Sequence, residues 1–290
     1  MYIHRTIQQI AFAQQMDMGG FPIRQPLPSR LISMLDPFLL LHHAILEVPQ
    51  ENDPKHSGVG PHPHRGFSPV SFIYRGGVHH RDSRGNDNVV YAGGTQWMNA
   101  GMGVIHSERP PADIHEKGGV QELVQLWINS PAKNKMDQPV YFPLTAEKTP
   151  VVVSDDQKTS IQVISGELNG IKGPIPALSP VNMFNVRIRK GGSYFIPFSR
   201  SHNAFIYVID GQLQVGNAEE IEAFYMAAFN TDGDGIELNA LEDSVVLVGT
   251  GEPLKEPVVS HGPFVMNNET QIMEAFRDYQ LGKMGVLIES

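Results

Sequence analysis

Short runs of apolar residues alternate with turn-forming residues along almost the whole chain. Clusters of Gly, Pro, Asn or Asp bound most of these runs, and the chain holds 28 glycines and 22 prolines. Closely spaced short apolar runs of this kind are typical of the strands of an all-β sandwich or barrel. We therefore expect strands within residues 39–45, 70–74, 123–128, 151–153, 161–164, 183–188, 205–209, 221–228 and 245–248.

Only two segments of the sequence show a helical pattern. Residues 111–118 form a short candidate, and residues 268–281 form a stronger one. In the second segment Asn268 suits the N-cap position, and Gln271 follows three residues later. Three apolar side chains at helical spacing form one stripe, which we expect to pack against the strands: Ile272, Phe276 and Tyr279.

A weak internal repeat indicates two similar lobes. When Gly77 is aligned with Gly211, the segment His62-Pro63-His64 falls on Ile196-Pro197-Phe198. The proline is kept, but both histidines have become apolar, so one lobe has polar site residues and the other has that site filled. A length of 290 residues also favours two domains. We place their boundary in the proline-rich stretch 131–150, which gives domains of residues 1–140 and 141–290.

The first candidate site is the segment His62-Pro63-His64. Histidines at i and i+2 of an extended strand point to the same face, because side chains alternate along a strand. Pro63 keeps the segment extended and cannot donate a ladder hydrogen bond, which places this strand at an edge or at the mouth of a barrel. A single His-x-His is common in turns and on surfaces, so the prediction of a metal site depends on a second pair.

His106 and Glu108 supply that second pair at the same i, i+2 spacing. If the two pairs face one another inside a barrel, they offer three imidazole nitrogens and one carboxylate oxygen. This ligand set suits one divalent transition metal ion with open coordination positions. Fe(II) is favoured, and Mn, Ni, Co, Cu and Zn can also accept such a site.

Composition excludes several classes of site and partner. The chain contains no cysteine, which excludes disulfides, thiolate metal sites and cysteine nucleophiles. A net charge of −9 argues against direct binding of nucleic acid. No apolar stretch approaches the roughly 20 residues that cross a membrane, and no signal-peptide pattern opens the sequence. We therefore expect a cytoplasmic protein without a membrane or nucleic-acid partner.

The other histidines lack partners at ligand spacing. His79 and His80 follow a predicted strand, and an exposed hairpin end is favoured over a place in the pocket or behind the metal ligands. For Trp97 and Met98, core packing is favoured over a place in the pocket lining. Structural or solvated roles are expected for the remaining histidines considered, which are His42, His43, His56, His115, His202 and His261.

The motifs together closely resemble the pirin family. The resemblance rests on HPHRGF at residues 62–67, GTQWMNAG at residues 94–101 and GVIHSERP at residues 103–110, and it extends to GPFVMN at residues 262–267. It implies a bicupin, with two jelly-roll-like antiparallel β-barrels in one chain, a C-terminal helix and a mononuclear metal in the N-terminal barrel alone. The ligands it implies are the four residues already chosen from spacing, His62, His64, His106 and Glu108.

The resemblance also implies a function. Several pirin-like proteins are described as quercetin 2,3-dioxygenases, so we expect a flavonol such as quercetin and dioxygen as substrates, with Glu108 as a catalytic base. Eukaryotic members are described as nuclear transcription co-regulators, which leaves a metal-dependent protein-binding role without turnover as the alternative. Many pirins carry an acidic residue and then Thr where this chain has Ser68 and Pro69. We expect the loss of that carboxylate to weaken flavonol turnover, and Ser68→Glu to restore it.

Overall fold

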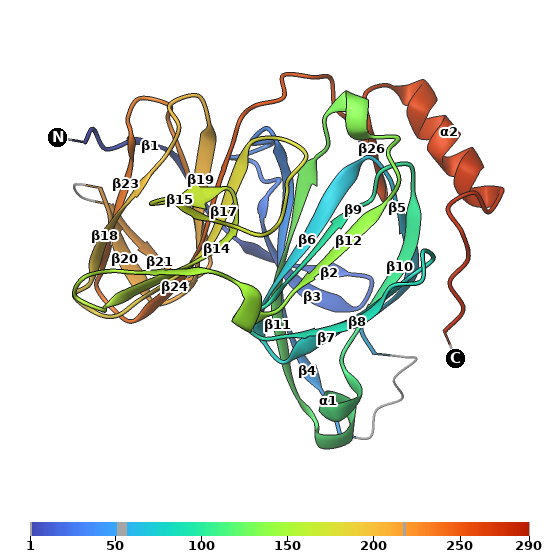
Figure 1. Ribbon diagram of the computed structural model, residues 1–290, viewed down its shortest axis with the longest axis horizontal. Helices are drawn as coiled ribbons and strands as arrows, with labels where there is room; N and C mark the ends of the chain where they lie inside the picture. Colours follow the sequence, from blue (N-terminus) through green and yellow to red (C-terminus); the bar gives the residue numbers. More distant parts are fainter. Residues whose placement is uncertain (1, 51–56, 217–218, 290) are drawn as a thin grey trace. The chain divides into compact units, whose positions relative to one another are not determined.

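The computed structural model describes residues 2–50, 57–216 and 219–289 (Figure 1). Contacts divide the chain into two compact units. The unit that we call the N-terminal barrel contains Met16–Ile23, Leu40–Lys148 and Lys255–Ser290. The C-terminal barrel contains Met1–Gln15, Arg24–Leu39 and Thr149–Leu254. The expected boundary at residue 140 differs from this grouping at both ends of the chain. The first residues join the C-terminal barrel, and the last helix joins the N-terminal barrel.

The N-terminal barrel consists of two antiparallel sheets. The larger sheet has seven strands in the order β12 (Val140–Leu144), β9 (Thr95–Asn99), β6 (Phe67–Arg75), β11 (Gly119–Asn129), β4 (Phe38–Val48), β3 (Phe21–Leu27) and β2 (Gln14–Met18). The smaller sheet has four strands in the order β5 (Val59–His64), β10 (Val104–Arg109), β7 (Gly77–Asp82) and β8 (Asp87–Tyr91). The 3-10 helices η2 (Ala132–Asn134) and η3 (Ala146–Lys148) flank β12, and the short helix α1 (Ala112–Lys117) precedes β11.

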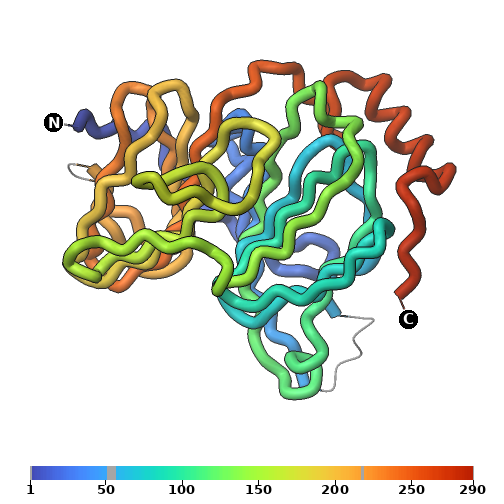
Figure 2. Tube along the Cα trace, viewed as in Figure 1, coloured from blue at the N-terminus to red at the C-terminus, as the bar shows by residue number. Residues whose placement is uncertain are grey.

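The C-terminal barrel repeats this arrangement of a seven-stranded and a four-stranded sheet. The larger sheet has the order β1 (Ile7–Phe12), β22 (Tyr225–Phe229), β19 (Asn203–Asp210), β24 (Ser244–Gly251), β17 (Val181–Ile188), β14 (Thr159–Ser165) and β13 (Val151–Val153). The smaller sheet has the order β18 (Ser193–Pro197), β23 (Gly235–Ala240), β20 (Gln212–Val215) and β21 (Glu219–Glu222). The blue N-terminal strand lies among the orange strands of this barrel (Figure 2).

The apolar core of the C-terminal barrel occupies the positions that carry histidines in the other barrel. Ile196 faces Ile236 across β18 and β23, as His62 faces His106 across β5 and β10. Both isoleucines are buried in one apolar cluster, which Phe198 also joins. The strand that pairs with β18 is therefore β23, and it corresponds to β10 of the N-terminal barrel. That the C-terminal barrel binds no metal stays a prediction.

Nearly all of the strands expected from apolar runs are present. The exception is residues 221–228, which the chain divides between β21 and β22 with a turn at Phe224 in the left-handed region, at φ 70°. Strands rich in polar residues, such as β2 and β7, were not expected, because an apolar run does not mark them. Trp97 and Met98 are buried, in agreement with their expected packing role.

Helix α2 (Glu269–Gln280) confirms the C-terminal helix. The Asn268 side chain caps it by accepting a hydrogen bond from the backbone N–H of Gln271, at 3.0 Å. Ile272 is buried and Phe276 packs edge-on against Phe264, in the hairpin of β25 (Val259–His261) and β26 (Phe264–Met266). A further short hairpin joins β15 (Glu167–Leu168) to β16 (Ile171–Lys172). No helix within the described residues combines the length and apolar character that crossing a membrane requires.

Candidate metal centre

Pairing of β5 with β10 brings three predicted ligands together. His106 lies opposite His62 in the antiparallel ladder, and Val104 lies opposite His64. Because residues at i and i+2 share a face, the three imidazoles meet on one side of this sheet. One nitrogen from each of His62, His64 and His106 lies within 4.8 Å of the others. The ring centroids of His62 and His106 are 4.3 Å apart.

Hydrogen bonds place the protons of two of these rings. His62 Nδ1 lies 2.8 Å from the carbonyl of Gly60, and His64 Nδ1 lies 3.4 Å from the carbonyl of Pro263. A carbonyl oxygen only accepts, so each Nδ1 carries the proton and each Nε2 has a free lone pair. The two Nε2 atoms are 3.1 Å apart. Two lone pairs at this distance repel each other, and a bound cation turns that repulsion into coordination.

The third ring fits the same arrangement. His106 Nε2 is buried and has no hydrogen-bond partner within residues 2–50, 57–216 and 219–289. Burial, together with the neighbouring imidazoles, holds the pKa of His64 and of His106 well below the usual value. Both rings are therefore neutral at pH 7, which is the form that binds metal. The donor set and its protonation fit a divalent transition metal ion.

Glu108 lies in the same cavity but outside the group of close donor atoms. The ladder shifts register between His106 and Glu108, an irregularity of the kind that redirects a side chain. Ser71 Oγ donates to one carboxylate oxygen at 2.9 Å, and Gln125 Nε2 donates to the other at 2.8 Å. The structure thus brings three of the four predicted ligands together and holds the fourth beside them by two hydrogen bonds.

A cavity of about 330 Å³ opens beside the histidines, between the two sheets of the N-terminal barrel. Its walls come from β3, β4 and β11 as well as β5 and β10, and they are mostly apolar. Side chains that line it and that sequence analysis did not select include Phe21, Leu40, His42, Gln125 and Trp127. His42 was expected to be structural or solvated; burial lowers its pKa to about 4, so it is a neutral wall residue at pH 7.

Alternation along β11 was the signal that could have identified part of this wall. Leu123, Gln125 and Trp127 occupy every second position of that strand and all face the cavity. The indole N–H of Trp127 donates to Gln125 Oε1 at 3.1 Å, so Gln125 links the aromatic wall to Glu108. A polar residue between two large apolar ones, all on one face, is typical of a ligand site and less so of a core.

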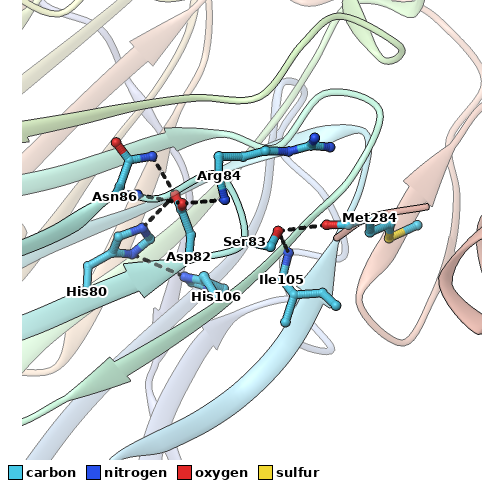
Figure 3. A network of polar contacts seen from close by, with 8 residues as sticks. All are labelled: His80, Asp82, Ser83, Arg84, Asn86, Ile105, His106 and Met284. Atoms are coloured by element: carbon cyan, nitrogen blue, oxygen red, sulfur yellow. Dashed lines mark hydrogen bonds and ion pairs between the residues drawn. The ribbon is translucent and has the colours of Figure 1, made fainter. Parts of the chain in front are cut away.

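The favoured expectation for His80, an exposed hairpin end, was wrong, and the alternative of a place beside the predicted ligands agrees with the structure. Only 1% of its surface is exposed, because β7 pairs with β10 and turns His80 inward beside His106. Figure 3 shows the ring between Asp82 and His106. The neighbouring His79 faces outward and pairs with Asp87 at the surface. Burial alone would raise the pKa of Asp82, but hydrogen bonds from His80, Asn86 and Arg84 outweigh it and lower that pKa.

Among the described residues, the other histidines named from the sequence do not belong to the histidine cluster. His43 is buried and bonds Glu122 at 3.1 Å, His115 is buried in α1, and His202 Nδ1 lies 3.1 Å from Thr250 Oγ1. His261 stacks edge-on against Phe276. His56 lies outside the described residues.

Ser68 does not face the cavity. Residues three apart in a strand point to opposite faces, and Ser71, which bonds Glu108, is three residues after Ser68. The Ser68 hydroxyl is buried and donates to Asn99 Oδ1 at 2.8 Å. An acidic residue here would therefore lie away from a bound substrate, which contradicts the expectation that Ser68→Glu restores activity.

Comparisons with known proteins cover both barrels. The family profile described as Pirin matches residues 20–128, and the profile of the Pirin C-terminal cupin domain matches residues 183–285. A crystal structure of quercetin 2,3-dioxygenase from Acinetobacter baumannii is 35% identical, covers 99% of this chain and 100% of its own, and superposes with a TM-score of 0.91.

Relatives from distant organisms show the same extent of similarity. A pirin-like protein of Caulobacter vibrioides is 35% identical over 92% of this chain and 94% of its own length. Pirin of Rattus norvegicus is 33% identical over 94% of this chain and 90% of its own. Similarity therefore runs through both cupin barrels and includes the strands that carry the histidine cluster, and the chain belongs to the pirin family.

Proposed function

We propose that the N-terminal barrel holds one divalent transition metal ion through His62, His64, His106 and Glu108. The main support for the proposal is that three imidazole Nε2 atoms converge at one cavity. In His62 and His64 the Nδ1 atom carries the proton, because it faces a backbone carbonyl, and the Nε2 atom is therefore unprotonated. Glu108 would complete the set by moving from its present hydrogen bonds toward the ion. Fe(II) is the metal we favour for this mixture of imidazole and carboxylate, and Mn, Ni, Co, Cu and Zn suit it as well.

We further propose that the protein is a dioxygenase whose substrates are dioxygen and a flavonol such as quercetin. The cavity supports this substrate class because its walls are apolar and its volume of about 330 Å³ falls in the range of small-molecule sites. The Acinetobacter relative that matches the whole chain is described as a quercetin 2,3-dioxygenase. Ring cleavage of a flavonol with release of carbon monoxide takes both oxygen atoms from dioxygen, so no further reductant is required.

The proposed reaction gives roles to Glu108, Gln125 and the apolar walls of the cavity. When bound, the metal ion supplies Lewis acidity that lowers the pKa of a substrate hydroxyl and brings the reactants together. Glu108 would act as the base when it detaches from the ion and returns to its hydrogen bonds with Ser71 and Gln125, because these bonds leave a free lone pair on each oxygen to accept the proton of that hydroxyl. Gln125 orients Glu108, and the apolar walls, with Trp127 among them, hold a planar aromatic ring and exclude water.

The test combines metal content with turnover. Elemental analysis of the purified full-length protein should give about one ion per chain, and His106→Ala should retain almost none. His79→Ala is the matched control, because this neighbouring histidine pairs with Asp87 at the surface and should leave the metal in place. Full metal content in His106→Ala would refute the ligand assignment.

Turnover is measured separately, as loss of quercetin absorbance and release of carbon monoxide in air. Protein loaded with Fe(II), Mn, Ni or Cu should exceed the free-metal control, and Glu108→Gln should lower the rate more than the metal content. A metal-loaded protein that leaves quercetin unchanged with every ion would refute flavonol oxidation. It would favour the alternative of a metal-dependent protein-binding or transcription co-regulatory protein. The cytoplasmic location stays a prediction.

A further inference from the structure

His106 differs from the other two histidines in what holds its second nitrogen. Backbone carbonyls fix the protons of His62 and His64, but His106 Nδ1 lies 3.4 Å from another imidazole nitrogen, His80 Nδ1. An imidazole nitrogen can donate or accept, so this contact alone does not decide where the His106 proton lies. The position of the His106 proton therefore depends on which nitrogen of His80 carries a proton.

Asp82 fixes that proton. One of its carboxylate oxygens accepts the backbone N–H groups of Arg84 and Asn86, at 2.9 and 3.1 Å. The other accepts the Asn86 side-chain amide at 2.7 Å and faces His80 Nε2 at 3.1 Å. An ionised carboxylate only accepts hydrogen bonds, so Nε2 of His80 must carry a proton. In a neutral ring the His80 Nδ1 lone pair is then free to accept from His106.

The consequence is a defined tautomer for His106. If His80 Nδ1 accepts, His106 Nδ1 donates, and His106 Nε2 keeps a free lone pair. That atom is the one that is buried and without a partner among the described residues. We propose that Asp82 and His80 are positioning residues that hold His106 in its Nδ1–H form and aim its Nε2 at His62 and His64. The proposal rests on the proposed metal site.

The surroundings keep this relay in place. The His80 ring stacks on Tyr141 at a centroid distance of 3.9 Å and an angle of 5°, which fixes the plane of the ring. In the turn after Asp82, Ser83 Oγ accepts the backbone N–H of Ile105 at 3.1 Å and donates to the carbonyl of Met284 at 2.7 Å (Figure 3). The turn is thus fastened to β10 one residue before His106.

In a competing arrangement the hydrogen bond between His80 and His106 runs in the opposite direction. If His80 carried protons on both nitrogens, paired with Asp82, it would donate to His106 Nδ1 and move the His106 proton to Nε2. That proton would point at the other two histidines and block coordination. Nuclear magnetic resonance of metal-free, full-length protein with 15N-labelled histidine separates the two, because protonated and unprotonated ring nitrogens differ widely in 15N shift. We expect His106 to carry its proton on Nδ1 alone; a proton on Nε2 would overturn the proposal.

Two substitutions at His80 form a matched pair. The side-chain amide of Asn superposes on the Nδ1 position of histidine, and that of Gln superposes on the Nε2 position. Both lose the stack on Tyr141, but only His80→Asn keeps an acceptor for His106. By competition with a chelator, His80→Gln should bind metal about 10- to 100-fold more weakly than wild type. His80→Asn should recover most of that loss.

Further variants and outcomes separate this relay from the metal site itself. Asp82→Asn keeps one oxygen for the turn but presents an N–H to His80, so it should lower metal affinity as His80→Gln does. Ser83→Ala removes the bonds to Ile105 and Met284 but keeps every polar group of the relay, so it should lower stability and should lower metal affinity less than Asp82→Asn does. Equal affinity for His80→Gln and His80→Asn would refute the relay. Wild-type protein that has the Nδ1–H tautomer but binds no metal would refute the proposed function and leave the relay standing.

Discussion

Replacing Lys135 with methionine tests how the N-terminal barrel is held together beside its histidines. Only 1% of this lysine is exposed, and its ammonium group donates three hydrogen bonds. The acceptors are the carbonyl of Gly66 at 2.6 Å, Asn129 Oδ1 at 2.7 Å and the carbonyl of Val265 at 3.0 Å. One side chain therefore joins the end of the HPHRG segment to β11 and to β26.

The expected cost follows from these contacts. Methionine fills a similar volume but leaves three buried acceptors without their donor, at about 1–3 kcal/mol each. Removing the ammonium also removes the penalty of several kcal/mol for burying a charge, so the two effects partly cancel. We expect the net free energy of unfolding to fall by about 3 kcal/mol, which corresponds to a urea midpoint lower by about 1.5 M for a barrel of this size.

Tryptophan fluorescence is the assay, because both tryptophans of the chain, Trp97 and Trp127, belong to the N-terminal barrel. Lys133→Met is the matched control, since Lys133 is an exposed lysine of η2, the 3-10 helix that Lys135 caps, and should change the midpoint little. Equal midpoints for Lys133→Met and Lys135→Met would refute the reasoning.

The pH dependence of stability gives a second test of the same variant, because the direction of the change can be predicted. Burial lowers the pKa of Lys135 to about 8, against 10.5 for a free lysine. Between these values the unfolded chain binds more protons than the folded one, so raising the pH favours the folded state. The stability of wild type relative to Lys135→Met should therefore increase from about pH 8 to pH 10.5. A difference that does not increase over this window would show that the folded lysine keeps its proton.

Three further predictions concern stability. Ser68→Glu should lower the tryptophan-monitored midpoint without raising quercetin turnover, because the new carboxylate would face Asn99 Oδ1. Ile236→Ala should cost about 2–4 kcal/mol in thermal unfolding through the cavity it leaves, with metal content unchanged. Chelation should leave unfolding cooperative and the near-UV circular dichroism native, because a chain of this length buries enough apolar surface without a metal; loss of that signal on chelation would contradict us.

Sequence reasoning identified the histidine cluster because part of its geometry is local. Period-two alternation places His62 with His64, and His106 with Glu108, on shared faces before any tertiary contact is known. The pairing of β5 with β10 then brings His106 to the other two histidines. Apolar runs likewise identified most strands of both barrels. The repeat between His62 and Ile196 required only a fixed spacing, and the strand pairs place these two residues in corresponding sites.

The rest of the site depends on pairings that no local pattern contains. His80 reads as a hairpin residue in the sequence, and only the pairing of β7 with β10 turns it inward. Gln125 and Glu108 come from strands of different sheets, so their hydrogen bond follows from barrel closure. Lys135 reads as a solvated loop lysine, and its burial follows from acceptors as distant in sequence as Val265. Tertiary structure decided these roles.

Comparison of the two barrels shows that the position of the proposed ligand His106 and the position of His80 are both apolar in the C-terminal barrel. Across β10 and β7 Glu108 faces His80, and across β23 and β20 Leu238 faces Val215. The C-terminal barrel thus has an apolar residue at the position of His80 as well as at those of the proposed ligands. A buried imidazole nitrogen without a hydrogen-bond partner costs about 1–3 kcal/mol of stability. A histidine at the position of His80 is therefore favourable only where a second histidine, such as His106, is its partner. His80 is present in the barrel that has His106 and replaced in the barrel that has Ile236, as expected if it serves that ligand.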